Sequence, residues 1–405
     1  MSEYERSRLL ALWRAEAATY NFSMSMSTTI AQAYAIKVLK FDLELLGTMV
    51  LVHLGTLGVG YLLGSVVVSV FRNRRILFWK AMGLLNRCLW ALTGFSHNLP
   101  SEHRAWAFLT AIATAQLSGS IAAVASGDVG ADLVGRERAI KFFSSLSSIN
   151  LVANSLGLVV ATVFFNLLPE EEGYVATYST SLVFSAISSG FLLMLKDVDP
   201  PASRTSIKDL VKDFTDVTRS SGCTSYIKVA TLFTFIVNLP GALWNYYLLN
   251  VLGGNETWVT MKAIAANLSQ SVGFRIWSRV SRRLGLKKTL YVGIALTSPI
   301  PATFIFLPSL PGQIALEVYS GFVWAAYNLA NNIYTLYLPK RAVRVYFIAI
   351  LNVAGNTLAS AASRIGASIA SVSLLAMNTV FIASTLGRVI ASVLARKSAP
   401  EVLIR

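Results

Sequence analysis

Long apolar runs, separated by short charged or Pro- and Gly-containing breaks, constrain this sequence more than any other feature. A lipid core about 30 Å thick requires roughly 20 apolar residues per helix, because each backbone amide must bond within its own helix. The runs lie at residues 15–38, 43–70, 76–97, 104–127, 142–168, 174–195, 226–250, 256–277, 288–307, 312–337, 344–368 and 373–395. The sequence therefore predicts an all-α polytopic membrane protein with twelve transmembrane helices.

Composition excludes a water-soluble domain, because 54% of the 405 residues are hydrophobic and only 14% are charged, against about 25% in soluble proteins. The net charge of +15 could suggest a nucleic-acid partner. However, the basic residues do not gather with aromatic residues on one polar face, as phosphate binding would require. We therefore expect no nucleic-acid partner, and no cofactor or metal site is indicated.

The basic residues instead mark the orientation, because cytoplasmic loops are enriched in Lys and Arg. Odd-numbered loops contain little beyond Lys37, Lys40 and Arg104. The loops after even-numbered spans hold Arg72, Arg74, Arg75, Arg136, Arg138, Lys141, Arg279, Arg282, Arg283, Lys287, Lys288, Lys340, Arg341 and Arg344. We expect a multi-pass protein of the cytoplasmic membrane with both termini in the cytoplasm.

The longest polar stretch, residues 196–225, lies midway along the chain and divides six spans from six. Within it, apolar residues from Ile207 to Val217 recur at helical spacing, with Lys and Asp between them. This pattern predicts an amphipathic helix on the inner leaflet. The expected organisation is an N-terminal six-helix bundle (1–195), a cytoplasmic linker (196–225) and a C-terminal six-helix bundle (226–405).

An internal repeat supports this division. Residues 58–77, GVGYLLGSVVVSVFRNRRIL, align without gaps on residues 271–290, SVGFRIWSRVSRRLGLKKTL. A second block, SGSIAAVA from Ser118, recurs as SGFVWAAY from Ser320. The repeat spans six helices, an even number, so the two pseudo-symmetric halves enter the membrane in the same direction.

With these repeats, the chain resembles the major facilitator superfamily, of the prokaryotic type. In that family the loop between helices 2 and 3 carries a Gly-x-x-x-Asp-Arg-x-Gly-Arg-Arg signature, whose acid is implied to help lock the cytoplasmic gate. Both copies here keep the basic ending and lack the acid. Charge pairs from the segment that contains Asp132 and Arg138 are expected to substitute for it.

The resemblance also implies that helices 1, 4, 7 and 10 line a central cavity. These predicted helices carry polar and aromatic residues, often three or four positions apart and thus on one face. Packing between helices is the alternative role for each of them. The candidate substrate-binding residues are Asn21, Ser25, Gln32, Gln116, Asn238, Asn245, Trp324, Tyr327, Asn328 and Asn331.

Charged residues inside predicted spans are costly and usually functional. Lys262 and Glu317 lie at similar depth near the outer face, so we expect an ion pair that breaks or forms during gating, with a permanent structural bridge as the alternative. Glu317 is the best-placed protonation site. Arg87 is the most deeply placed cation and could attract an anionic solute, with a structural role as the alternative. Arg364 and Arg388 are expected near helix ends, where they can snorkel.

These observations favour a secondary active or facilitative transporter that moves a small solute by alternating access. Both transport without a coupled ion and coupling to an ion such as H+ are compatible with them. We expect a monomer in the lipid bilayer. A membrane sensor or scaffold that does not transport is the alternative function. A membrane-embedded enzyme would need convergent His, Asp or Glu residues, and no such motif is present in the sequence.

Overall fold

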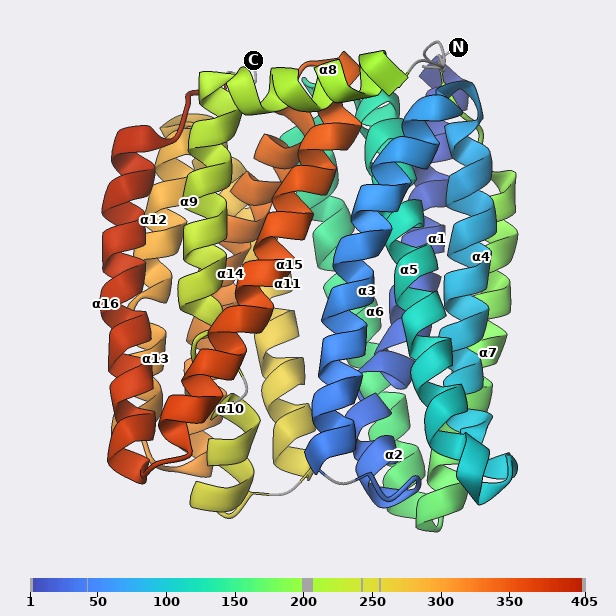
Figure 1. Ribbon diagram of the computed structural model, residues 1–405, viewed down its shortest axis with the longest axis vertical. Coiled ribbons are helices and arrows are strands. Elements are labelled where there is room, and N and C mark those ends of the chain that lie inside the picture. The colour runs from blue at the N-terminus through green and yellow to red at the C-terminus, as the bar shows by residue number, and fades with distance from the viewer. Residues whose placement is uncertain (1–2, 42, 199–206, 242, 255, 403–405) are drawn as a thin grey trace. The chain divides into compact units, whose positions relative to one another are not determined.

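The computed structural model describes residues 3–41, 43–198, 207–241, 243–254 and 256–402, and every regular element in them is helical (Figure 1). The elements of the N-terminal half are α1 (Glu3–Thr28), α2 (Ala31–Lys37), α3 (Leu43–Val70), η1 (Arg72–Arg74), α4 (Arg75–Leu92), η2 (Thr93–Asn98), α5 (Ser101–Val134), α6 (Ala139–Leu167) and α7 (Glu170–Met194). Those that follow are α8 (Ile207–Arg219), α9 (Ser221–Asn238), α10 (Leu243–Tyr246), η3 (Tyr247–Val251), α11 (Glu256–Leu284), α12 (Leu286–Thr297), α13 (Pro299–Phe306), α14 (Leu310–Tyr337), η4 (Arg341–Val343), α15 (Arg344–Ala370) and α16 (Leu374–Ser398).

Each predicted span corresponds to one long helix or to helices in succession, and the all-helical fold is confirmed. Seven helical segments of the described residues are long and apolar enough to cross a membrane, and one of them is formed by α12 and α13 together. The largest boundary error is at the first span, which was predicted to begin at residue 15, whereas α1 begins at Glu3. Charged residues in the first turns of α1 hide the helix from a reading based on apolar runs.

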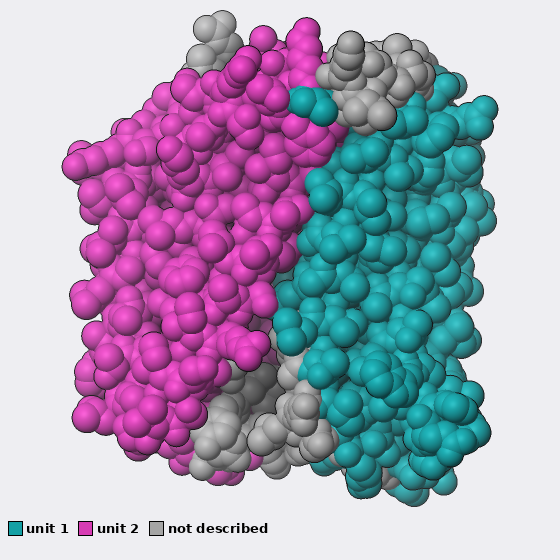
Figure 2. Space-filling view, viewed as in Figure 1, with its two compact units in different colours: residues 1–135, 149–211 teal, residues 136–148, 212–405 magenta. Residues whose placement is uncertain are grey.

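The chain forms two compact units, which Figure 2 distinguishes by colour. Unit 1 comprises residues 1–135 and 149–211, and unit 2 comprises residues 136–148 and 212–405. In unit 1, α5 packs against α3 and α4, and α1 packs against α7. Tyr34, Trp90, Phe108 and Tyr178 form part of its buried aromatic core.

In unit 2, α14 packs against α11 and α12, and α9 packs against α15 and α16. The internal repeat is visible in the matching helix pairs. A Cβ atom at Gly60 of α3 would lie 2.8 Å from the carbonyl oxygen of Leu117 in α5, and one at Gly273 of α11 would lie 3.0 Å from that of Phe322 in α14. Glycine at the repeated position lets both helix pairs approach closely.

The amphipathic helix predicted between the halves is α8, Ile207–Arg219. Its apolar face was expected to lie on lipid, and the described part of that face is divided: Val211 is 60% exposed, whereas two other residues contact protein. Phe214 packs against Tyr346 of α15 with ring centroids 4.7 Å apart, and Val217 is fully buried. The same spacing suits a lipid surface or a protein surface, so the sequence pattern could not distinguish them.

Candidate functional site

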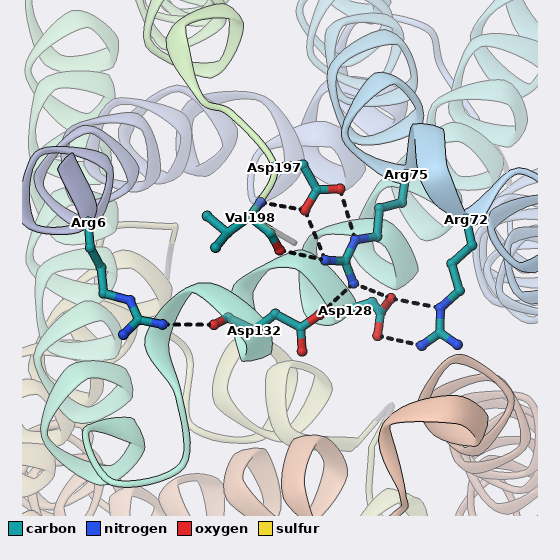
Figure 3. A network of polar contacts seen from close by, with 7 residues as sticks. All are labelled: Arg6, Arg72, Arg75, Asp128, Asp132, Asp197 and Val198. Carbon is teal, nitrogen blue, oxygen red and sulfur yellow. Dashed lines mark hydrogen bonds and ion pairs between the residues drawn. The ribbon is translucent and has the colours of Figure 1, made fainter. Parts of the chain in front are cut away.

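A buried ion-pair network at one end of unit 1 is centred on Arg75, the first residue of α4 (Figure 3). Its guanidinium contacts three carboxylates. Arg75 Nη1 lies 2.6 Å from Asp128 Oδ2 and 2.8 Å from Asp132 Oδ2. Arg75 Nη2 lies 2.9 Å from Asp197 Oδ1, and Nε donates to Asp197 Oδ2 at 3.0 Å. This two-pronged geometry requires the planar fork of arginine.

The network joins three parts of unit 1 that are distant in sequence. Asp128 and Asp132 project from α5 one turn apart, and Asp197 follows the end of α7. Arg72, in η1, contacts the other side of the Asp128 carboxylate at 3.3 Å. The fully buried Asp128 thus lies between two guanidinium groups, which offset the cost of burying its charge.

The network brings carboxylates to the loop that lacks the signature acid. The acids come from α5 and from the segment after α7, and the basic residues come from the loop. Of the two residues predicted to supply substitute pairs, Asp132 lies in the network, and Arg138 is exposed. Asp128 and Asp197 were not singled out from the sequence, because their meeting depends on how α5 and α7 pack.

A second buried ion pair lies along the helices of unit 1, between Glu16 of α1 and Arg87 of α4. Both side chains are at most 5% exposed. The Arg87 guanidinium also lies over the Tyr20 ring, 4.7 Å from its centroid. Tyr20 in turn donates to the Asn86 side chain at 3.1 Å, and Asn86 donates to the Ala115 carbonyl at 2.7 Å.

The sequence did not indicate that Glu16 is the partner of Arg87. The first span was predicted to begin at residue 15, so Glu16 was expected at the very start of that span. Since α1 begins at Glu3, Glu16 lies about 20 Å along the helix at 1.5 Å per residue. Arg87 was expected either to attract an anionic solute or to have a structural role, and its carboxylate partner was not anticipated. Its Nε and Nη1 atoms are buried without hydrogen bonds.

In unit 2, Lys262 of α11 and Glu317 of α14 lie together, as their predicted depths suggested. Lys262 Nζ is 3.1 Å from Glu317 Oε1, with side-chain exposures of 8% and 21%. The ammonium also lies 4.9 Å from the centroid of the Phe304 ring. The pair is therefore partly shielded from solvent, while its gating role stays a prediction.

Arg388 was expected near a helix end, yet it is only 1% exposed and lies in the interior of unit 2. Its Nη1 donates to the carbonyl of Thr297 at 2.9 Å. That carbonyl lacks its usual helical donor because Pro301, four residues on, has no N–H. One turn earlier in α16, Thr385 Oγ1 accepts from the N–H of Ala302 at 3.1 Å. Arg388 and Thr385 thus form hydrogen bonds with backbone groups at the break between α12 and α13.

The predicted cavity residues of unit 1 have local partners. Asn21 donates to the carbonyl of Ala17, and buried Ser25 donates to that of Phe22, both within α1. Gln116 contacts His53 of α3 at 2.7 Å, which makes His53 a hydrogen-bonding residue of the bundle. The side chain of Gln32 lies outside the described residues.

In unit 2, the predicted residues of α14 form an aromatic and amide face, while Asn245 has its side chain outside the described part of the chain. Trp324 and Tyr327 pack edge to face with ring centroids 5.7 Å apart. Asn328, the next residue in the sequence, is half-buried. Asn331 accepts from Tyr226 at 2.6 Å. Asn238 donates within α9 to the carbonyl of Thr234.

The sequence pattern of the Major Facilitator Superfamily matches residues 15–364, which is most of the chain. The chain belongs to the Major Facilitator Superfamily. No curated protein sequence matches it. Membership establishes a multi-pass membrane transporter of small solutes rather than an enzyme. In the described ranges, no three His, Cys, Asp or Glu side chains gather as a metal site.

Solved structures of this superfamily share the fold over nearly the whole chain. The proton:xylose symporter XylE bound to 6-bromo-6-deoxy-D-glucose has a TM-score of 0.73 at 12% identity, covering 99% of this chain and 97% of its own. A bacterial homologue of the iron transporter ferroportin, in an outward-facing state, has 0.72 at 14%, covering 97% and 99%. The human organic anion transporter MFSD10 has 0.72 at 14%, covering 98% and 100%. At these identities the likeness shows the fold alone.

Proposed function

We propose that this transporter couples solute movement to protons through the buried Glu16–Arg87 pair, by alternating access of two six-helix halves, residues 1–195 and 226–405. The supporting observation is a carboxylate that lies well inside the helices of unit 1 and forms a buried ion pair with Arg87. The sequence favoured Glu317 as the protonation site. Glu16 is more deeply buried, with a 5% exposed side chain against 21%.

A proton on Glu16 would change the charge of this cluster by a full unit. An ionised pair in a low-dielectric interior is held together by strong attraction that compensates for lost hydration. Neutralising Glu16 removes that attraction and leaves Arg87 charged, with Nε and Nη1 already lacking acceptors. Arg87 would then favour any anionic or carbonyl group that the solute or a moving helix presents. Proton binding and solute binding are linked in this way.

The other charge clusters fit a gating role in the same cycle. The Lys- and Arg-rich loops support a cytoplasmic location for both termini and for the Arg75 network, and we assign that network to the inner gate. The Lys262–Glu317 pair is assigned to the outer side. The linker, residues 196–225, joins the two halves in the cytoplasm.

The substrate-binding residues are inferred to be the polar and aromatic residues of α1, α5, α9 and α14, together with the neighbouring Gln32 and Asn245. Mixed amides, hydroxyls and aromatic rings suit a small polar solute. We also propose that the protein is a monomeric carrier of the prokaryotic type in the cytoplasmic membrane.

Reconstituted vesicles test the coupling. A thermal-shift screen of metabolites on purified protein identifies the solute, and Glu16→Gln is then compared with wild type in two assays. We expect the variant to lose solute-driven proton movement, measured with a trapped pH dye. It should retain exchange of labelled for unlabelled solute, which requires no net proton transfer.

Matched variants separate coupling from folding. Glu317→Gln removes the partly buried carboxylate of unit 2 and should keep proton movement. A Glu16→Gln, Arg87→Gln variant removes both charges and guards against misfolding caused by an unpaired arginine. Proton movement that persists in Glu16→Gln at the wild-type ratio of protons to solute would refute the assignment.

A further inference from the structure

One face of α11 in unit 2 carries a basic stripe made of Arg275, Arg279, Arg282 and Arg283. These residues lie four, seven and eight positions apart, so they project on the same side of the helix. All four are exposed. None forms an ion pair with any residue that the structure describes, and Arg282 donates to the carbonyl of Ser278 within its own helix.

The same face is apolar farther along the helix, which indicates that it meets lipid. Met261, Leu268, Val272 and Ile276 are exposed by 44, 45, 54 and 39%. The opposite faces of α11 are packed, since Trp277 donates to the carbonyl of Phe322 in α14. An exposed apolar stripe on a membrane-protein helix is solvated by acyl chains. The arginines that continue this stripe toward the helix end are therefore placed at the headgroups.

Comparison of the two repeats shows that the fold does not require these arginines. In the ungapped alignment of residues 58–77 with 271–290, the four arginine positions correspond to Leu62, Val66, Ser69 and Val70 of α3. Those residues occupy the equivalent helix, which packs on α5 as α11 packs on α14. The packing is thus compatible with uncharged residues, and the arginines are an addition of the second half.

The repeats also differ in what their remaining basic residues contact. Arg75 of the first copy forms ion pairs with three aspartates. Its counterpart Lys288 is exposed, and it forms no ion pair within the described ranges. A row of uncompensated cations on a lipid-facing surface repels itself unless an anion approaches. The positive charge in this half is therefore available to an external partner.

We propose that the basic stripe Arg275, Arg279, Arg282 and Arg283 binds the phosphate groups of anionic phospholipids. The stripe extends about 12 Å along the helix from first to last residue. Arginine side chains that start at different depths over this length can snorkel to the headgroups. Guanidinium groups bind phosphate oxygens in two-pronged fashion, and clusters of four or more basic residues beside a membrane helix attract anionic headgroups. The proposal is independent of proton coupling at Glu16.

Lipid retention by the purified full-length protein provides the test. Native mass spectrometry and thermal unfolding in detergent are measured with phosphatidylglycerol, with phosphatidylcholine, or with soluble glycerol phosphate. The test variant is Arg279→Gln, Arg283→Gln. The matched control is Arg396→Gln, Lys397→Gln, which removes two exposed charges from the last turn of α16.

We expect wild type to retain and be stabilised by phosphatidylglycerol over phosphatidylcholine. With about 1 kcal/mol per basic residue near the surface, loss of two charges should weaken this binding about 30-fold. The control should bind as wild type does. Equal retention of the two lipids by wild type, or unchanged preference in the test variant, would overturn the proposal. So would stabilisation by glycerol phosphate at the concentration effective for the lipid, which would assign a free phosphate instead.

Discussion

Removing the central cation of the buried network, by Arg75→Gln, is the sharpest test of how unit 1 is held together. Arg75 is fully buried and contacts Asp128, Asp132 and Asp197 at 2.6–2.9 Å. Breaking a buried pair by removing one partner costs about 3–5 kcal/mol, because it leaves a charge without compensation. Here three carboxylates lose one shared partner, so we expect a loss at the upper end of that range.

The assay is the free energy of unfolding in mixed micelles, obtained from denaturant titrations with a helical signal. Arg72→Gln is the matched control, because Arg72 contacts the Asp128 carboxylate at 3.3 Å. Asp128 keeps Arg75 in that control, so its loss should stay below about 2 kcal/mol. Arg75→Lys should restore little, since an ammonium cannot make the paired bonds to Asp197.

A double-mutant cycle distinguishes a specific pair from a general change in charge. Combining Arg75→Gln with Asp197→Asn removes one of the orphaned carboxylates, so the double variant should lose less than the sum of the single losses. A coupling of about 0.5–3 kcal/mol is expected for groups in direct contact. If Arg75→Gln destabilises no more than Arg72→Gln, or if the two changes are additive, the network does not stabilise unit 1 as argued.

Three further predictions concern unit 2. Gly321→Ala should destabilise the α11–α14 pair by more than 1 kcal/mol in thermal or denaturant unfolding, because the added Cβ would overlap the carbonyl oxygen of Ala266. Lys262→Met should destabilise more than Glu317→Gln in the same measurement, since methionine cannot donate to the carboxylate 3.1 Å away, whereas a glutamine amide can still accept from the Lys262 ammonium. Tyr226→Phe should cost about 1 kcal/mol by removing one 2.6 Å hydrogen bond to an amide.

Helix positions could be predicted from sequence because membrane helices carry their signal locally. The second predicted span, residues 43–70, coincides with α3. The failure at α1 has a physical cause, since the helix continues from Glu3 through residues that are not apolar. The length of an apolar run in the sequence indicates only the part of a helix that contacts lipid. Charged turns that neighbouring helices bury, as around Glu16, leave no such signal.

Site residues could be predicted only where a pair lies at the same depth on adjacent helices. Lys262 and Glu317 satisfied that condition, and their pairing was expected. The acids around Arg75 did not, because Asp197 lies some 120 residues away and meets it through the packing of α7 on α4. Arg388 was misplaced for a different reason. Its carbonyl acceptor exists only because a proline in another helix frees it, which no pattern around Arg388 reveals.

Three of the buried cations, Arg87, Lys262 and Arg388, differ in whether their partner can bind a proton. Arg87 and Lys262 each have a carboxylate partner, Glu16 and Glu317, that can lose its charge by binding a proton. Arg388 has a carbonyl acceptor and, in the described part of the chain, no acid. A guanidinium does not lose its own proton in proteins, so protonation cannot change the charge around Arg388. In the proposed mechanism, proton coupling is therefore assigned to Glu16, and Arg388 holds a fixed charge against the broken helix.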